Sequence, residues 1–369
     1  MQTAIPYMHF RGGSSKALYF NAKDLPTDET ARNKVILAAM EGSVLGDARQ
    51  IDGLGGGSSL SSKVAIVSPS DTEGVDLDYY FIQVMIGKGK VSTTQTCGNI
   101  LAGVLPFAIE SGMIQATHPT TSAKISIINT GGTCEVILET PNGQVNYTGK
   151  AKVDGVLGTS APIICNYLDT EGATCGALLP TGNPIDVING KEITCIDNGM
   201  PIVLMRANDF GITGYETKAE LDENDVLKKQ IESIRLQAGL KMNLGDVAYQ
   251  SVPKMCLISP PNTEGGIINT RMFIPHVCHD AIGVLAAVSV ATACILPKTI
   301  TENIAIFIAD PDNIGRGRNA LSVEHPTGEF TVNLDTKETE IGLIIEKSGV
   351  MRTARLLSKG VVFIPMDNG

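Results

Sequence analysis

The 369-residue sequence lacks extended basic segments. No run of lysine or arginine is longer than two residues, and 29 basic residues face 39 acidic ones, which gives a formal net charge of −10. Proteins that bind nucleic acid or anionic membranes need a basic surface, so the composition argues against both kinds of partner. If the substrate is itself an anion, a local pocket of positive potential has to bind it.

Segments that direct a chain into or across a membrane are also missing. The N-terminal residues have neither the charged start nor the apolar core of a signal peptide. No uninterrupted apolar run reaches the roughly 20 residues that span a bilayer. The longest candidate, Ala281–Leu296, is predicted to be a buried helix. These absences predict a cytoplasmic protein.

The eight cysteines lack the spacing of a metal site or a disulfide framework. None of them forms a Cys-x-x-Cys pair, and a chain of this size without a signal peptide is expected to keep its thiols reduced. His276 and His279 flank Cys278, but zinc needs a third protein ligand, and the sequence places none beside them. We therefore predict no metal site.

What the sequence has in abundance is glycine. Its 39 glycines and 18 prolines are scattered without a period, which favours many tight turns and a strand-rich or mixed fold. The length suits two domains of ordinary size. We predict an α+β protein with domains at 1–185 and 186–369, in which the last strand is free to cross back to the first domain.

The two halves share a plan of strands, an outer helix, further strands and a cysteine ahead of a buried helix. Cys97 is followed by Gly103–Leu105 and Cys278 by Gly283–Leu285, with the same Gly-Val-Leu letters. This suggests a duplication in which each cysteine lies at a helix N-terminus.

Hydrophobic periodicity and capping residues predict the individual elements. The helices are expected at Asp28–Glu41, Asn99–Ile109, Lys218–Ala238 and Cys278–Cys294. Residues 63–67 and 144–151 are among the expected strands.

The most informative local feature is the Cys97, Gly98 and Asn99 triplet at the predicted start of a helix. Free amides at a helix N-terminus bind carboxylates, and the same field favours a thiolate. Cys97 could then exchange a proton near neutral pH. The alternative is that Cys97 is a small buried residue and Asn99 a cap, and the triplet alone does not decide between them.

Two glycine- and serine-rich loops could hold a ligand. Gly56 and Gly57 lie in a segment that ends at Lys63, which the strand-like Val-Ala-Ile-Val follows. Glycines allow close backbone approach to a ligand, and partial desolvation would make Lys63 a usable base. Ser14 and Ser15, in the loop after Arg11, could hold a carboxylate. The plainer readings are a surface lysine at a strand edge and a solvated loop.

Two cations of the second half are further candidates. Arg271 and Lys254 each lie in a predicted strand and could clamp a carboxylate. An ordinary ion pair is the alternative for both. We find no nucleophile elbow, Rossmann fingerprint or kinase loop.

Several separate motifs resemble the PrpF-like isomerases, which share the diaminopimelate epimerase fold. They are Arg11–Lys16, Gln50–Gly56, Ser62–Ile66, Cys97–Ile100 and Glu324–Gly328. Three further segments resemble the members of this family that tautomerise 4-oxalomesaconate in gallate and protocatechuate catabolism: Ile196–Pro201, Met242–Asp246 and Ser251–Met255. The likeness covers nearly the whole chain.

The resemblance implies two similar domains, each a curled, mostly antiparallel sheet around a central helix, with the active site in the cleft between them. It implies no metal and no organic cofactor. In the family, the lysine that matches Lys63 removes a proton and the cysteine that matches Cys97 can return it. Two departures stand out: the family commonly has Thr where Ser14 stands, and often Gly-Gly-x-Pro-Leu-Thr at 56–61.

The sequence and the resemblance together predict a cofactor-independent isomerase that moves a proton along an unsaturated polycarboxylate, with Lys63 and Cys97 handling the proton. Aconitate and methylitaconate, on which siblings act, are alternative substrates. An amino-acid epimerase that pairs Cys97 with Cys278 is a second hypothesis, and a non-catalytic accessory protein a third. A homodimer is compatible with the sequence.

Overall fold

The computed structural model describes residues 2–93, 95–306, 318–339 and 342–365. The chain divides into two compact units, 1–168 with 351–369, and 169–350. This boundary lies earlier than the 185/186 position expected from the sequence. The reason is that the segment after Leu168 is bonded to the second unit: the backbone N–H of Cys175 donates to Asp197 Oδ2 at 2.8 Å, and Gly172 N–H to the Asp197 carbonyl at 2.8 Å.

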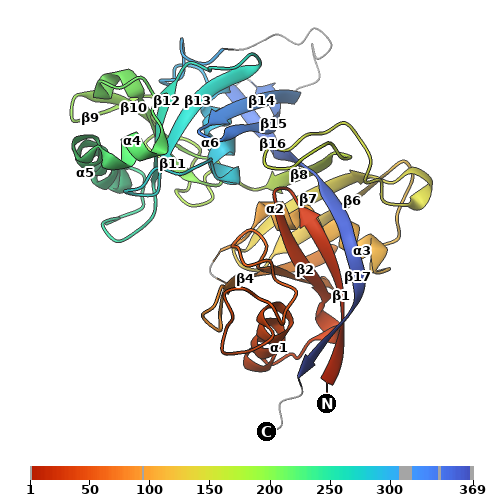
Figure 1. The fold of residues 1–369 in the computed structure, drawn as a ribbon. Coiled ribbons are helices and arrows are strands. Elements are labelled where there is room, and N and C mark those ends of the chain that lie inside the picture. Colours follow the sequence, from red (N-terminus) through yellow and green to blue (C-terminus); the bar gives the residue numbers. More distant parts are fainter. Residues whose placement is uncertain (1, 94, 307–317, 340–341, 366–369) are drawn as a thin grey trace. The chain divides into compact units, whose positions relative to one another are not determined.

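The first unit is built on one run of paired strands (Figure 1). Its strands are β1 (Gln2–Gly12), β2 (Ser15–Asn21), β3 (Lys63–Pro69), β4 (Leu77–Met85), β5 (Lys90–Ser92), β6 (Thr120–Ile127), β7 (Gly132–Glu139), β8 (Ile163–Leu168) and β17 (Ala354–Pro365). Its helices are η1 (Ala22–Asp24), α1 (Glu29–Glu41), α2 (Gly98–Leu101), α3 (Val104–Glu110) and η2 (Pro141–Gly143). β17, from the other end of the chain, lies antiparallel beside β1.

The second unit contains β9 (Asp186–Ile188), β10 (Lys191–Asp197), β11 (Pro201–Arg206), β12 (Lys254–Ser259), β13 (Gly266–Phe273), β14 (Arg318–His325), β15 (Gly328–Thr339) and all but the last two residues of β16 (Gly342–Arg352). Its helices are η3 (Ala207–Phe210), α4 (Lys218–Glu223), α5 (Asp225–Lys241) and α6 (Val284–Ile295).

The two units share one topology. In the first, β1–β2 is antiparallel, β2–β3 parallel, β3–β4 antiparallel and β4–β6 parallel. In the second, β10–β11, β11–β12, β12–β13 and β13–β14 follow the same order. The outer helix enters each unit at the first parallel crossover and the buried helix at the second. The predicted fold class, two similar α+β units, is confirmed.

The sheet of the first unit packs helices on both faces. Leu18, Val64 and Ile82 join Ile36 and Met40 of α1 in one buried cluster. Side chains alternate between the faces of a strand, so their neighbours point to the other side. There Tyr19 packs its ring 5.7 Å from that of Phe107 in α3, and its hydroxyl donates to the carbonyl of Ile100 in α2. The two helical layers are thus separated by the sheet.

In the second unit, α6 is the buried helix. It contacts β10 and β11 near one end of the strand order and β14 and β15 near the other, so the sheet curls around it. Residues 286–294 of this helix are buried throughout, as the apolar stretch Ala281–Leu296 predicts. On the outer side, α5 packs Leu227, Ile231 and Ile234 into a second cluster.

Local signals set most element ends, and tertiary contacts override some of them. The side chain of Asp28 caps α1 by accepting from Ala31 N–H at 2.8 Å, and Gly42 closes it at φ 74°. The predicted helix over 99–109 instead breaks between α2 and α3. Gly103 lies at the break, where a Cβ would stand 2.3 Å from the Tyr19 hydroxyl.

Two other expectations differ from the structure. The helix expected over 218–238 is divided at Asn224, whose side chain accepts from Leu227 N–H at 3.0 Å and starts α5 afresh. The strand expected at 144–151 does not form: the segment follows the Asn142 turn at φ 56° and has one isolated bridge, Ala151 to Ser160, in place of a ladder.

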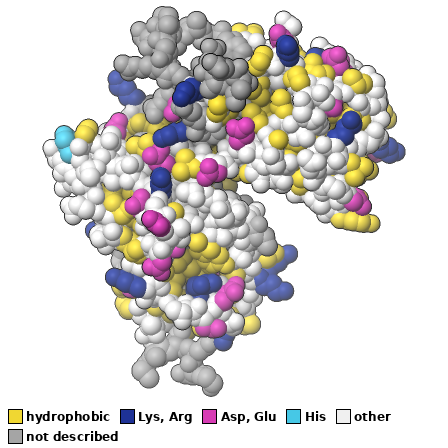
Figure 2. Space-filling model, turned by 180° about the vertical axis from the view of Figure 1, so that it is seen from behind, with side chains coloured by type: hydrophobic (Ala, Val, Ile, Leu, Met, Phe, Trp, Pro, Cys, Tyr) yellow, Lys and Arg dark blue, Asp and Glu magenta, His cyan; other side chains and the backbone are white. Residues whose placement is uncertain are grey.

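The surface carries both signs of charge. Figure 2 shows Lys and Arg interspersed with Asp and Glu on the face that it presents. Across the described ranges, no helix combines the length and the apolarity that crossing a bilayer requires. All eight cysteines fall within these ranges, and each is a free thiol.

Candidate active site

Lys63 is the first residue of β3 and is buried, with 8% of the residue exposed. It pairs with Ala17 of β2 and with Gln83 of β4. Lys63 Nζ donates to Gln83 Oε1 at 2.6 Å and lies 5.3 Å from the centre of the Phe81 ring. The reading of Lys63 as a surface lysine is therefore wrong.

Cys97 is the N-cap of α2 and is half-buried. Its carbonyl oxygen accepts a hydrogen bond from the Tyr79 hydroxyl at 3.2 Å. The side chain of Cys97 makes no capping hydrogen bond to the backbone amides of this helix start. Because α2 has only four residues, few peptide dipoles are aligned behind the thiol. The local amides remain as donors, but the helix field expected from the sequence is small.

Strand β4 carries the supports of both residues on one face. Tyr79, Phe81 and Gln83 are alternate residues of β4, so their side chains point to the same side. Gln83 holds Lys63, and Tyr79 holds the backbone at Cys97. Tyr19 of β2 hydrogen-bonds to α2. It pairs with Ala65 of β3, and this register places the Tyr19 side chain on the same face. The sheet face beneath α2 and α3 therefore supports both residues.

The turn between β1 and β2 packs against the start of α2. Asn99 Nδ2 donates to Ser14 Oγ at 3.2 Å and to Ser15 Oγ at 3.5 Å. The approach is so close that a Cβ on Gly12 would stand 2.2 Å from the Asn99 carbonyl oxygen, and one on Gly13 would stand 2.1 Å from Asn99 Oδ1. The structure thus brings together Ser14, Ser15 and Asn99, which lie far apart in sequence.

Arg11 fixes the same turn from behind. Its Nη1 donates to the Gly13 carbonyl at 2.9 Å and to Thr353 Oγ1 at 2.9 Å, and its Nη2 donates to Ser160 Oγ at 3.2 Å. Burial, and then the charge of Arg355, lower the pKa of the guanidinium. Arg11 therefore uses these hydrogen bonds to stabilise the turn.

The glycine-rich segment before Lys63 is organised by Gln50, which sequence reasoning missed. Gln50 is buried, and its Oε1 accepts from Gly57 N–H at 2.7 Å and from Ser62 Oγ at 2.8 Å. A Cβ on Gly56 would stand 2.4 Å from Ser61 Oγ, so this glycine serves the packing of the loop itself. The one feature of the sequence that pointed to this role was the position of Gln50 at the start of the Gly-rich motif.

Cys278 is not at a helix N-terminus, which corrects the expectation from the sequence. Helix α6 begins at Val284 with Gly283 as its N-cap, so the shared Gly-Val-Leu letters mark the helix start and the cysteine does not. Cys278 is 1% exposed, and its backbone N–H donates to Asp222 Oδ1 at 2.7 Å. Burial, and then the Asp222 charge, raise the pKa of the thiol to about 11.

Arg271, on β13, donates hydrogen bonds to other residues of the second unit. Its Nε donates to the Glu216 carbonyl at 2.8 Å, and its Nη1 donates to Asn269 Oδ1 and the Thr270 carbonyl, each at 2.9 Å. Burial lowers the pKa of this guanidinium. The pKa of Lys254 is lowered too, by burial and by the charge of Arg235.

The two histidines near Cys278 have separate neighbours. His279 Nδ1 accepts from Ala281 N–H at 2.8 Å, and His276 Nδ1 lies 3.6 Å from Glu232 Oε2. In the part of the chain that the structure describes, no group of three or more His, Cys, Asp or Glu side chains converges as metal ligands would.

Residues 2–365 match the model of the family described as PrpF protein. The chain belongs to the PrpF family. It is 49% identical to a 4-oxalomesaconate tautomerase of Pseudomonas putida, over 99% of this chain and 98% of the relative. It is 50% identical to a (4E)-oxalomesaconate Δ-isomerase of a Novosphingobium species, over 97% of each.

Among solved structures, a methylitaconate Δ-isomerase superposes with a TM-score of 0.85 at 30% identity, over 98% of this chain and 96% of that one. This PrpF-family chain is therefore an isomerase with the predicted epimerase-like fold.

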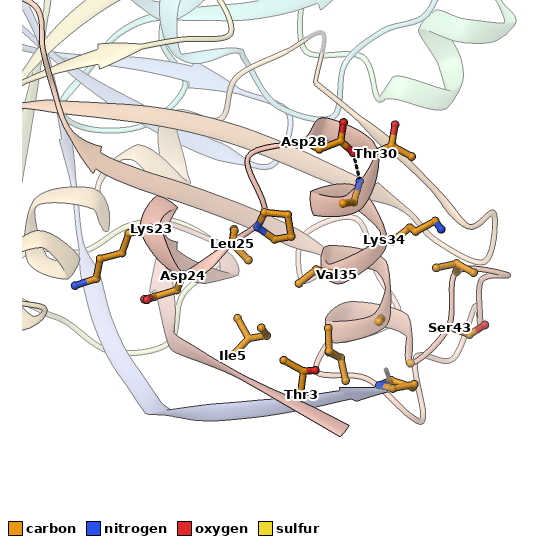
Figure 3. A pocket seen from close by; sticks show the side chains of 17 residues that line it. Thr3, Ile5, Lys23, Asp24, Leu25, Asp28, Thr30, Lys34, Val35 and Ser43 are labelled. Carbon is orange, nitrogen blue, oxygen red and sulfur yellow. Dashed lines mark hydrogen bonds between the residues drawn. The ribbon is translucent and has the colours of Figure 1, made fainter. Parts of the chain in front are cut away.

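The first unit of this PrpF-family chain has a groove of about 780 Å³, which lies away from Lys63, Cys97 and the other predicted site residues. Figure 3 shows Thr3 and Ile5 of β1, Leu25, and Lys34 and Val35 of α1 around it. These elements belong to the α1 side of the sheet, and none of the predicted site residues lines the groove. Its size fits a small ligand, and its lining includes Lys23, Asp24, Asp28 and Lys34.

Proposed function

We propose that this chain catalyses the tautomerisation of 4-oxalomesaconate by a 1,3-allylic proton shift, without a cofactor, with Lys63 as base and Cys97 as acid. Two relatives at 49% and 50% identity carry oxalomesaconate in their names. The methylitaconate Δ-isomerase, at 30% identity, is more distant. This difference favours oxalomesaconate over methylitaconate as the substrate.

The observation that carries the proposal is the surroundings of Lys63. A lysine that acts as a base needs a site without a carboxylate partner, because an ion pair would hold it as the ammonium. The hydrogen-bond partner of Lys63 Nζ is the neutral amide oxygen of Gln83, at 2.6 Å. A neutral partner stabilises the ammonium less than a carboxylate would. These surroundings suit a general base.

In the proposed reaction, Lys63 takes a proton from the carbon that lies beside the carbonyl and the conjugated alkene. The electron pair of that C–H bond spreads over a dienolate. Backbone amides at Gly98 and Asn99 and the hydroxyls of Ser14 and Ser15 would hold its negative oxygen and the carboxylates. Cys97 S–H then protonates the far carbon. Lys63 ends as an ammonium and Cys97 as a thiolate, and a proton transfer through solvent resets both.

The epimerase hypothesis, in which Cys97 and Cys278 act as a pair, is less well supported. A thiol whose pKa is about 11 stays protonated at neutral pH and cannot act as the base there. Such an enzyme would also leave Lys63 without a role.

The experiment is turnover of 4-oxalomesaconate in deuterated water, with methylitaconate and aconitate as competing substrates. We expect deuterium at the new allylic position and a kcat/KM preference for 4-oxalomesaconate. Lys63→Met should lower the rate by roughly two to four decades, the range for loss of a general base. Lys124→Met, on the exposed side of β6, is the matched control. Full activity in Lys63→Met, or a label only at an α-carbon, would overturn the proposal.

A further inference from the structure

Gln83 lies directly opposite Lys63 in the antiparallel β3–β4 pair. Facing side chains in such a pair start from Cβ atoms about 5 Å apart, which brings their ends within hydrogen-bonding reach. The bond from Lys63 Nζ to Gln83 Oε1, at 2.6 Å, is short. The contact therefore follows from strand register and does not depend on a flexible loop.

The orientation of the Gln83 amide is determined by its other neighbours. Its Nε2 donates to the Ser62 carbonyl at 2.9 Å, and to the carbonyls of Ser59 and Val84, each at 3.3 Å. Carbonyl oxygens can only accept, so the amide nitrogen must face them. The amide oxygen is thereby turned toward Lys63.

This orientation decides how Lys63 presents its nitrogen. An amide oxygen accepts and cannot donate, so Lys63 has to direct an N–H toward Gln83. The lone pair of a neutral amine then points away from Gln83 and stays available to take a proton. The anchor is itself rigid, because the Ser62 carbonyl also accepts from Val84 N–H at 3.0 Å and the Ser62 hydroxyl donates to Gln50 at 2.8 Å.

We propose that Gln83 is a positioning residue for the reaction: its amide oxygen orients the nitrogen of Lys63 toward the substrate without placing a countercharge beside it. This inference rests on the proposed function, because it takes Lys63 to be the base. A glutamine is suited to the task since it supplies an acceptor of fixed direction without a countercharge.

The decisive variant is Gln83→Glu, which keeps the shape and the acceptor but adds a negative charge. An opposite charge this close favours the protonated ammonium, so Lys63 should lose its proton at higher pH. We expect the acidic limb of the kcat/KM–pH profile to move up by roughly one to three pH units. Gln144→Glu, which adds the same charge at an exposed loop residue of the same unit, should leave the limb in place.

A second variant separates orientation from charge. Gln83→Leu removes the acceptor at similar size, and the Ser62 carbonyl keeps its bond to Val84 N–H. A misdirected base should lower kcat by about tenfold to a hundredfold while KM changes little. The acidic limb should not shift as it does in Gln83→Glu.

A readout that does not depend on the substrate distinguishes this inference from the proposed function. The pH midpoint for acylation of Lys63 by acetic anhydride, followed by peptide mass spectrometry, should rise in Gln83→Glu and not in Gln144→Glu.

If Lys63→Met is fully active, the proposed function fails, whatever Gln83 does. If Lys63→Met is inactive but Gln83→Glu moves neither the limb nor the midpoint, only the positioning role fails. If Gln83→Glu does not fold, Gln83→Leu decides: unchanged kcat overturns the inference, and a kcat loss at unchanged KM supports it.

Discussion

The hydroxyl of Tyr79 donates a hydrogen bond to the carbonyl oxygen of Cys97 at 3.2 Å, and so ties the start of α2 to the sheet face that carries Lys63. Burial, and then the nearby Cys97 thiol, raise the pKa of Tyr79 well above its ordinary value. The phenol therefore remains a donor at any working pH.

Tyr79→Phe should remove this tie and little else, since the Cys97 carbonyl keeps its bond from Leu101 N–H. We expect a loss of about 1 kcal/mol in the free energy of unfolding, the usual value of one hydrogen bond. We also expect kcat to fall by about tenfold because the thiol is less well placed. Tyr80→Phe, on the opposite face of β4, is the control. Equal kcat values in the two variants would argue against the tie.

Cys97→Ser tests the second half of the proton shift. A serine hydroxyl is far too weak an acid to deliver the proton, whereas Lys63 can still remove one. We expect isomerisation to fall steeply while exchange of the abstracted hydrogen with solvent deuterium continues, as followed by NMR. If exchange and isomerisation fall together, Cys97 places the substrate and does not deliver the proton.

Gly13→Ala tests the contact between the β1–β2 turn and Asn99. Gly13 has φ +50°, and the added Cβ would also meet Asn99 Oδ1 at 2.1 Å. Gly74→Ala is a matched control, because its φ is +77° but nothing lies within 4 Å of the new Cβ. Each should lose about 1 to 2 kcal/mol of stability from the left-handed backbone alone. Only Gly13→Ala should lose more than this and raise KM, as measured by urea unfolding and steady-state kinetics.

His9 should make the stability depend on pH. Burial, and then the charge of Lys16, lower its pKa from 6.5 to about 4. Between these values the unfolded chain binds more protons than the folded one, so this contribution is complete above pH 6.5 and is lost as the pH falls toward 4. His9→Gln should flatten the urea-unfolding free energy over this window. An unchanged pH dependence in His9→Gln would contradict the assignment.

Much of the fold could be predicted because its signals are local. Asp28 and Gly42 bound α1 through a side-chain cap and a left-handed closing residue, both of which depend on residue type alone. The Gly-Val-Leu letters at 103 and 283 each open a buried helix. Sequence prediction failed where a distant residue is involved: at the break between α2 and α3, the Tyr19 hydroxyl of β2 donates to the Ile100 carbonyl and leaves no room for a Cβ on residue 103.

For the site, the sequence by itself determined which residues could exchange protons or hold a carboxylate, since Lys63, Cys97 and Asn99 are recognisable from their types and their immediate neighbours. Only the tertiary structure decided which neighbours support these residues and which neighbours keep a similar residue, such as Cys278, protonated. Gln83 meets Lys63, and Tyr79 meets Cys97, because of strand register and helix packing between segments that are not adjacent in the chain. Cys278 has the same residue type as Cys97, yet its burial beside Asp222 keeps it protonated. Burial and cross-strand partners are properties of the folded pairing, and no local pattern specifies them.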